Sequence, residues 1–202
     1  MSQYSIKDVK ILSRKRSFQG YFAVDEILLK HRLFEGGWSS EVKRELFERG
    51  SAAAVILYDP KLEEVVLIKQ FRVGALASKR SPWMYEIVAG IIEEGETADH
   101  VVQRESVEEA GLPLDGLYFI QDCFPSPGGC SECVSLYAGK VDASKAGGIH
   151  GLDEENEDIL AERVSLETLK GYLDKGMIEN LPCLAACQWL LLNRDKLHKL
   201  WS

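Results

Sequence analysis

The sequence predicts an α+β protein in which a mixed β-sheet is covered on its faces by a few helices. Three observations lead to this prediction. Two short apolar runs, Ala52–Tyr58 and Glu64–Phe71, are joined by the turn-forming Asp59-Pro60-Lys61. A helix with clear end signals is expected over residues 98–110, and two amphipathic segments follow near the end of the chain. Such helices pack best against the faces of a sheet.

The first 50 residues differ from the rest because they are mostly extended chain interrupted by turns. Gly50-Ser51 separates them from the first apolar run. We therefore divide the chain into a small N-terminal antiparallel β domain, residues 1–50, and a larger domain, residues 51–202. Within the small domain Val9–Ser13 and Tyr21–His31 are β-rich. A turn-rich break at Arg32–Ser40 then precedes the last stretch, Glu41–Arg49.

The larger domain continues after the first hairpin with further strands, one acidic loop and two helices. No internal repeat or low-complexity linker interrupts it. The expected elements are strands at Met84–Val88, Tyr118–Phe124 and Val134–Val141, a loop at Lys145–Asp158, a helix from Ser165 to about Gly176, and a longer helix at Leu181–Leu200.

A glycine-rich loop followed by an acidic helix is the most informative motif in the chain. Thr97 is a suitable N-cap for the helix, and Gly111 stands where helices commonly end in a left-handed residue. Glu105 and Glu109 are four residues apart and share one helix face. In full, the motif reads Gly90, five residues, Glu96, seven residues, Arg104-Glu105-x-x-Glu108-Glu109-x-Gly111, and the apolar Leu112.

Crowded carboxylates on one short helix repel each other unless a positive charge lies among them. An acidic run is more often a solvated face, but here Arg104 and the preceding glycine loop favour a site. Arg104 can hold a neighbouring carboxylate through forked hydrogen bonds, and Mg²⁺ prefers carboxylate oxygens. We therefore predict that Glu105 and Glu109 bind Mg²⁺ and that Glu108 assists. Glu96 and Arg104 are expected to brace the loop against the helix.

Composition narrows the classes of protein. The chain has 202 residues, 46% of them hydrophobic, and a net charge of −8, which argues against a nucleic-acid binder. Neither an 18-residue apolar stretch nor a basic start followed by an apolar run is present, so we expect a cytoplasmic protein without membrane contact. Five cysteines suggest no disulfide framework, and Cys130-Ser-Glu-Cys133 lacks the partners of a zinc site. Cys183 and Cys187 are expected in the core.

The glycine-loop motif resembles the Nudix box at all of its charged and glycine positions. Its one departure is Ser106, where many Nudix hydrolases have a large aliphatic residue, and this should alter packing under the helix. Pro127, sixteen positions after Gly111, resembles the marker of the ADP-ribose pyrophosphatase branch. Segments 41–50 and 147–158 are also similar to the bacterial members of that branch, and the resemblance spans Gly20 to Trp201.

The resemblance implies a metal-dependent diphosphate hydrolysis. It assigns the metal to the carbonyl of Ala89 and to the carboxylates of Glu105, Glu109 and Glu157. The ion would be Mg²⁺, with Mn²⁺ as the alternative, and two or three ions would occupy each site. Glu155 would be the general base on a mobile loop. From residue types alone, Glu154 and His150 remain alternatives, and the loop itself has the composition of a solvated acidic turn.

The resemblance also implies a set of substrate contacts and a homodimer. Aromatic strand residues are usually core residues, although Tyr21 beside Gly20 and Gln19 is the stronger candidate for an exposed platform. A diphosphate needs a cation besides the metals, and Arg72 between Phe71 and Val73 is the first candidate. In the family the N-terminal domain crosses between subunits. The implied substrate residues are Tyr21, Phe22, Arg44, Glu45, Arg49, Arg72, Ile91, Ser126, Pro127, Gly128 and Glu132.

The function that we expect is hydrolysis of ADP-ribose to AMP and ribose 5-phosphate. One alternative is a pyrophosphatase for another nucleoside diphosphate sugar, such as ADP-glucose or GDP-mannose. Another is a non-catalytic ADP-ribose sensor, although such proteins commonly have a degraded box and a DNA-binding helical domain, whereas this box is intact and the chain is acidic.

Overall fold

The computed structural model describes residues 4–77 and 80–201. The chain forms two compact units. One contains the residues up to Gly50 together with Ser126–Glu132, and the other contains Ser51–Pro125 and the chain from Cys133 onward. The sequence places segment 126–132 in the larger domain, and the structure corrects this. It belongs with the first unit because the Phe47 N–H donates to the Gly129 carbonyl (2.8 Å) and the Ser131 N–H donates to the Phe47 carbonyl (3.1 Å).

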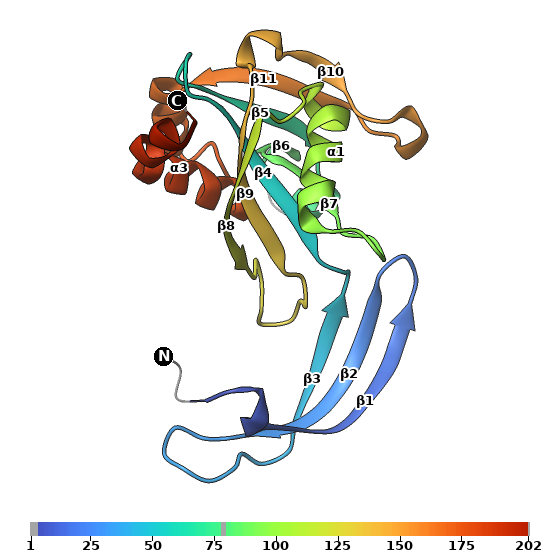
Figure 1. The fold of residues 1–202 in the computed structure, drawn as a ribbon. Coiled ribbons are helices and arrows are strands. Elements are labelled where there is room, and N and C mark those ends of the chain that lie inside the picture. The colour runs from blue at the N-terminus through green and yellow to red at the C-terminus, as the bar shows by residue number, and fades with distance from the viewer. Residues whose placement is uncertain (1–3, 78–79, 202) are drawn as a thin grey trace. The chain divides into compact units, whose positions relative to one another are not determined.

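The first unit is a three-stranded antiparallel sheet, as expected, with β2 in the middle (Figure 1). β1 continues well beyond the predicted end at Ser13. The residues after Ser13 are mostly polar and therefore give no strand pattern in the sequence. Arg14 and Arg16 on β1 both form ion pairs with the buried Asp25 on β2, and this long-range pairing holds the polar stretch in the sheet. The elements are η1 (Ile6–Asp8), β1 (Val9–Gln19), β2 (Ala23–His31) and β3 (Val42–Glu48).

The second unit contains a mixed sheet with the strand order β10-β11-β5-β4-β9-β8. β4 and β9 run parallel, and the other neighbours pair antiparallel, including β6 beside β5 and β7 beside β4. This confirms the predicted α+β class. The strands are β4 (Ala52–Asp59), β5 (Glu64–Phe71), β6 (Trp83–Glu86), β7 (Val88–Ile91), β8 (Gly116–Cys123), β9 (Val134–Lys140), β10 (Gly148–His150) and β11 (Ile159–Ser165).

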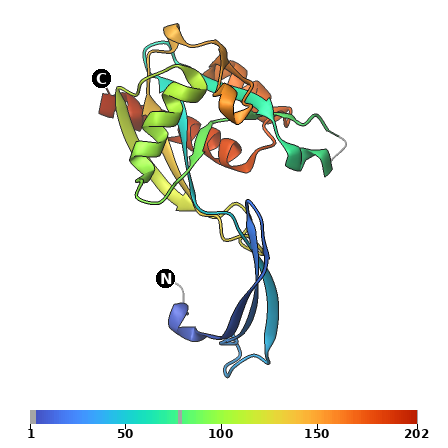
Figure 2. The same cartoon turned by 90° about the vertical axis from the view of Figure 1, so that its right-hand side faces the viewer.

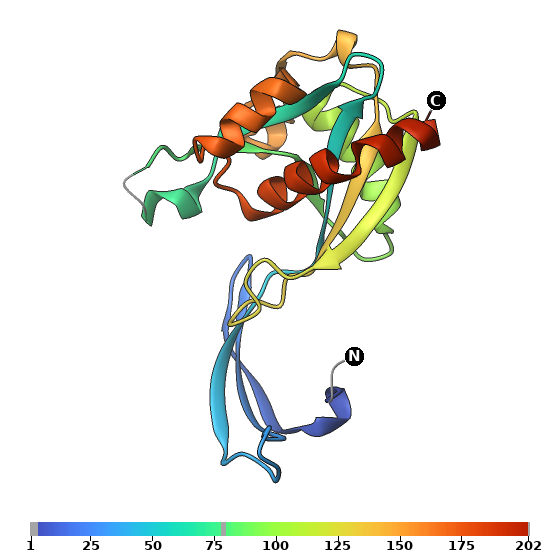
Figure 3. The same ribbon diagram turned by 90° about the vertical axis from the view of Figure 1, so that its left-hand side faces the viewer.

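Helices cover both faces of this sheet. α1 (Ala98–Ala110) lies on one face, and α2 (Leu166–Asp174) and α3 (Leu181–Trp201) lie on the other (Figures 1 to 3). Every residue of β4 is buried. Its even-numbered side chains, such as Ile56, join the core under α2 and α3, and its odd-numbered ones, such as Leu57, join the core under α1. The sheet therefore separates two apolar cores.

The helix of the glycine-loop motif has the predicted bounds and caps. The Thr97 hydroxyl oxygen accepts a hydrogen bond from the His100 N–H (3.4 Å), and Gly111 has φ +68° in the left-handed region. Val101 and Val102 face the sheet and are fully buried. Ser106 is also buried, and its hydroxyl donates to the Leu112 carbonyl (2.6 Å), so this small residue fastens the C-terminal end of the helix.

Two expectations for the larger domain need correction, and one of its strands has no counterpart among the predicted elements. The strand expected at Met84–Val88 is two strands, because the chain changes partner at Ile87, from β5 to β4. The stretch expected to be loop at 145–158 contains β10 and η4 (Asp153–Glu155), and η3 (Ala143–Lys145) leads into it. β11 was not anticipated, because charged residues break its apolar pattern. η2 (Val73–Ala77) completes the elements.

In the parts of the chain that the structure describes, no helix is long and apolar enough to span a membrane. Cys183 and Cys187 are fully buried in α3, as predicted, and the five cysteines are free thiols.

Candidate active site

The glycine loop and α1 bring two carboxylates against one short piece of backbone. Glu109 is 2% exposed, and its Oε2 accepts a hydrogen bond from the Ala89 N–H (3.0 Å). Glu105 lies against Gly90, where a Cβ would fall 1.9 Å from Glu105 Oε1. Residue 90 must therefore be a glycine for Glu105 to keep this position.

Arg104 braces the acidic helix, as the sequence predicted. Its Nη1 donates to Glu105 Oε1 and to Glu108 Oε2, both at 2.8 Å. Its Nε lies 3.5 Å from Glu96 Oε1, and Glu96 in turn accepts a hydrogen bond from the Glu93 N–H in the loop (3.1 Å). One guanidinium thus ties the loop to the helix and offsets part of the charge of the carboxylates.

The surroundings of Glu105 and Glu109 disfavour the charged forms of their carboxyl groups. Burial raises the pKa of Glu109 to about 8; the hydrogen bond from the Ala89 N–H and the charge of Arg72 oppose this shift, while the charges of Glu105 and Glu157 add to it. Burial likewise raises the pKa of Glu105 to about 7; Arg104 opposes this shift, while Glu108 and Glu157 add to it. For both carboxyl groups the neighbouring donors and cations do not offset the effect of burial, so the charged forms are disfavoured.

Glu157 and Glu155 lie on the loop between β10 and β11. The Glu157 carboxylate accepts a hydrogen bond from the Leu152 N–H (3.2 Å), which closes the loop on itself. Glu155 ends η4 and is exposed. At the start of the loop the Gly151 N–H donates to the Glu108 carbonyl (3.1 Å), so the loop is attached to the last turn of α1.

His150, the alternative base, stands directly before this attachment point. A ring nitrogen of His150 lies 3.1 Å from the Gly147 carbonyl, and a Cβ on Gly111 would approach its ring to 2.7 Å. The ring therefore packs over the end of α1 and engages its own turn.

The donor set fits a divalent cation by its chemistry. Glu105, Glu109 and Glu157 all offer oxygen ligands, and the charge of Glu157 is near enough to raise the pKa of both Glu105 and Glu109. Within the described residues no three His, Cys, Asp or Glu side chains are gathered around one point where an ion would sit. Glu157 is directed to Leu152 instead. The carboxylates of Glu105, Glu109 and Glu157 therefore lie near one another but are not directed at one common point.

Arg72 follows β5 and is held by a carboxylate that the sequence analysis missed. Its Nε (2.9 Å) and Nη2 (2.8 Å) both contact Oε2 of Glu86 on β6. Burial alone would lower the pKa of Arg72, but the hydrogen bond and charge of Glu86, together with the charges of Glu109 and Glu157, raise it overall. The available signal in the sequence was a glutamate within the otherwise apolar stretch before the glycine loop.

In the first unit, aromatic and charged side chains gather around the end of β3. Phe22 packs edge-on against Tyr21 (4.7 Å between ring centroids) and Phe47 (5.2 Å). Tyr21 is 86% exposed, so it is not a core residue. The Arg49 guanidinium lies 5.4 Å from the centre of the Phe22 ring and 3.4 Å from Glu132 Oε1. Its buried Nε has no hydrogen-bond partner among the described residues.

The remaining predicted contacts occupy turns and strand positions. The Ser126 carbonyl accepts from the N–H groups of Gly129 (3.3 Å) and Cys130 (3.0 Å), which makes a tight turn around Pro127 and Gly128. Arg44 bonds the neighbouring Lys43 carbonyl (2.8 Å), and Glu45 pairs with Glu26 in the strand register. Ile91 ends β7 opposite Ala52 in the second unit. These positions stay predictions as substrate contacts.

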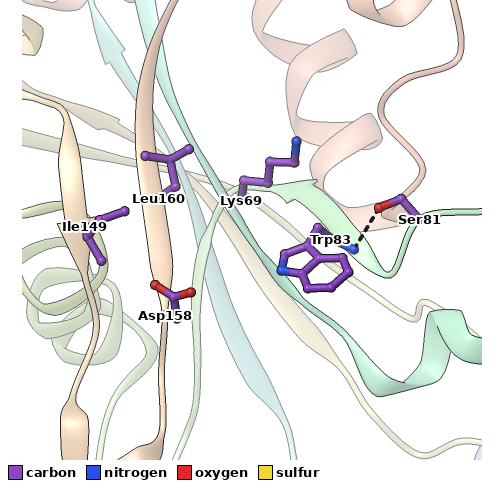
Figure 4. A pocket seen from close by; sticks show the side chains of 6 residues that line it. All are labelled: Lys69, Ser81, Trp83, Ile149, Asp158 and Leu160. Carbon is purple, nitrogen blue, oxygen red and sulfur yellow. Dashed lines mark hydrogen bonds between the residues drawn. The ribbon is translucent and has the colours of Figure 1, made fainter.

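A hollow of about 450 Å³ lies on the other face of the second unit's sheet (Figure 4). Lys69 of this hollow lies over the ring of Tyr85, which packs with the core under α2 and α3. None of the predicted site residues lines the hollow, so we do not assign it to the candidate active site. Its lining residues are Lys69, Ser81, Trp83, Ile149, Asp158 and Leu160.

Comparison with known proteins identifies the class to which this fold and acidic helix belong. A model of the NUDIX domain matches residues 48–186, and the chain therefore belongs to the NUDIX domain family. This confirms the resemblance drawn from the box.

Within that family the chain is similar over nearly its whole length to two bacterial ADP-ribose pyrophosphatases. It is 45% identical over 195 residues to that of Escherichia coli (strain K12), which covers 96% of this chain and 93% of the relative. It is 43% identical over 205 residues to that of Haemophilus influenzae, which covers 100% and 94%. A GDP-mannose pyrophosphatase of Cronobacter sakazakii is 33% identical over 120 residues, 58% of this chain and 62% of that protein.

A solved structure described as an ADP compounds hydrolase shares the fold, with a TM-score of 0.68. It is 18% identical in sequence and covers 93% of this chain and 97% of its own. The likeness supports the fold class predicted from the sequence.

Proposed function

We propose that this protein hydrolyses the diphosphate bond of ADP-ribose to AMP and ribose 5-phosphate. The observation that carries the proposal is the pair of box carboxylates, Glu105 and Glu109, held against Ala89 and Gly90 where burial disfavours their charged forms. The near full-length similarity to ADP-ribose pyrophosphatases supports the choice of substrate.

The cation that we propose is Mg²⁺, with Mn²⁺ as a substitute and two or three ions per site. Glu105, Glu109, Glu157 and the Ala89 carbonyl would hold it. When bound, a divalent cation offsets the negative charge that develops on phosphate oxygens during hydrolysis. Binding would also stabilise the charged forms of Glu105 and Glu109, which burial and, to a smaller extent, neighbouring carboxylates disfavour.

Glu155 is the proposed general base. Its exposure leaves the carboxylate accessible to a water molecule, and its place two residues before Glu157 brings it near the proposed metal ligands. A carboxylate in this role takes a proton from the attacking water. Arg72 is the proposed diphosphate cation, because it lies in the field of the same carboxylates and its side chain is 45% exposed.

The first unit would bind the nucleoside half of the substrate, and we propose that it serves the second chain of a homodimer. The exposed Tyr21 offers a flat surface for stacking a base. Arg49 lies against the Phe22 ring and retains a donor that has no hydrogen-bond partner in the described part of the chain. Mixing an inactive Arg44→Ala chain with an inactive Glu109→Gln chain should restore activity if the sites are shared. Absence of recovery after confirmed subunit exchange would contradict sharing.

The test of the function is a hydrolysis assay of the purified protein against ADP-ribose, ADP-glucose and GDP-mannose, with and without Mg²⁺. We expect ADP-ribose to be the preferred substrate, with activity that EDTA removes and Mg²⁺ restores. Glu105→Gln and Glu109→Gln should each lower turnover by orders of magnitude while the chain remains folded. Metal-independent turnover, or turnover without preference for ADP-ribose, would contradict the proposal.

GDP-mannose is kept as a second candidate substrate because a GDP-mannose pyrophosphatase shares 33% identity with part of this chain. A preference for it would keep the metal and base assignments and change only the nucleoside specificity.

A further inference from the structure

Glu86 is a charged group that is almost wholly removed from solvent. It is 4% exposed and ends β6, next to Ile87, where the chain changes strand partner. Its Oε2 contacts Nε and Nη2 of Arg72, and Gln70 Nε2 lies 3.4 Å from the same oxygen. A buried carboxylate is costly unless it is paired and hydrogen-bonded, and Arg72 supplies the charge that permits this burial.

The second oxygen of Glu86 is fixed from the opposite side by Asn180. The Asn180 Nδ2 donates to Glu86 Oε1 (2.8 Å). The same side chain caps α3, because its Oδ1 accepts a hydrogen bond from the Cys183 N–H (3.0 Å). Both oxygens of Glu86 are therefore occupied, and one of them is fastened to a helix terminus.

Arg72 is held on one edge only. Glu86 takes its Nε and Nη2, and no hydrogen bond from Nη1 to another described residue is present. Its side chain remains 45% exposed, whereas that of Glu86 is 5% exposed. A guanidinium fixed along one edge offers its free edge in a constant direction. Forked donors of this kind match the oxygens of phosphate groups.

Stability alone does not account for this arrangement. Replacing a buried ion pair by apolar residues of similar volume is often neutral or stabilising. The benefit of the pair is the fixed direction of a cation that a flexible side chain would otherwise move through several rotamers. Consistent with a common site, the charges of Glu109 and Glu157 act on Arg72.

We propose that Glu86 is a positioning residue that holds the free edge of Arg72 toward the diphosphate of the substrate, and that Asn180 holds Glu86 in turn. This inference rests on the proposed function for the identity of the substrate. Glu86 touches neither substrate nor metal in this scheme and acts through Arg72 alone.

The test is a double-mutant cycle with Glu86→Gln, Arg72→Ala and the two combined, in the full-length protein. Gln keeps the volume of Glu86 but removes the charge that holds the guanidinium. We expect Glu86→Gln to raise the KM for ADP-ribose about tenfold or more, with a smaller change in kcat. In the Arg72→Ala background the same substitution should leave KM unchanged, because its target is gone.

Glu64→Gln is the matched control. Glu64 Oε2 receives Nε (2.9 Å) and Nη2 (2.8 Å) of Arg163, nearly the same pairing geometry, in the same sheet. It should leave KM unaltered. Asn180→Ser keeps a capping oxygen for α3 but is too short to reach Glu86, so it should raise KM in the same direction as Glu86→Gln and by less.

Melting curves give a readout that needs no turnover. Glu86→Gln should lower the melting temperature when Arg72 is present and raise it in the Arg72→Ala background, where it removes an unpaired buried charge. An unchanged KM in Glu86→Gln, or an equal rise in KM in both backgrounds, would overturn the positioning role. If the wild-type protein prefers another nucleoside diphosphate sugar, the function proposed above fails, and the cycle is run on that substrate with the same criteria. If Glu86→Gln does not fold, an unchanged KM in Asn180→Ser would overturn the positioning role.

Discussion

Gly90→Ala adds one methyl group that should displace the Glu105 carboxylate without removing it. A Cβ at this residue would lie 1.9 Å from Glu105 Oε1, 2.4 Å from its Cδ and 2.6 Å from its Cγ. Ordinary contacts begin at 3.4 Å, so the carboxylate oxygen must move by about 1.5 Å. Gly90→Ala changes no charged group and requires no left-handed backbone, since Gly90 is not among the glycines with positive φ.

We expect Gly90→Ala to lower ADP-ribose turnover about 100-fold, because a displacement of about 1 Å in a catalytic group can cost that much. An Mg²⁺ titration of hydrolysis should show a higher half-saturating concentration, and circular dichroism should show the fold intact. Gly171→Ala is the control: a Cβ there meets nothing within 4 Å, and the substitution lies inside α2. It should keep full activity and stabilise the protein by about 0.5–1 kcal/mol. Normal metal dependence in a folded Gly90→Ala protein would refute the reasoning.

Three further predictions concern single side chains. In the metal-free protein Glu109→Gln should raise the free energy of unfolding, measured by denaturant titration. The pKa of Glu109 is about 8 in the folded protein against an ordinary 4.5, so the stability that this carboxyl group contributes is present below pH 4.5 and is lost as the pH rises towards 8. The gain from the substitution should therefore be about 3 kcal/mol at pH 7 and should vanish at pH 4. Ser106→Ala should cost about 1–2 kcal/mol in the same measurement, with turnover retained, since the Leu112 carbonyl loses its buried donor; an unchanged stability would contradict this. Glu155→Gln should lower kcat about 10²–10⁴-fold with little change in ADP-ribose binding, whereas Glu154→Gln should do neither, and the reverse pattern would relocate the base.

The sequence predicted the elements whose signals are local. The bounds of α1 follow from Thr97 and Gly111, which act within one turn of the helix. β11 was missed because its residues are recognisable as a strand only once they pair with β5, far away in the chain. The break at Ile87 has the same origin, since it depends on which neighbour each half of the stretch pairs with.

The candidate site divides in the same way. The spacing of Glu105 and Glu109 is a property of any helix, so their common face could be predicted. The closeness of Glu105 to Gly90 and the pairing of Glu86 with Arg72 depend on how β6, β7 and α1 pack. No local pattern contains that information. A glutamate in an apolar stretch was a visible anomaly, but its partner could be named only from the fold.

The attachment of the Glu155 loop to α1 has a consequence for the entropy of substrate capture. The segment between β10 and β11 is fastened at Gly151, through the Glu108 carbonyl, and at Ile159, in the sheet. Immobilising a backbone residue costs about 1–2 kcal/mol at room temperature. Since folding has already fixed both ends, a ligand that orders this loop bears that cost only for the short stretch between them. Ordering this loop should therefore weaken ligand binding less than ordering a longer loop with free ends would.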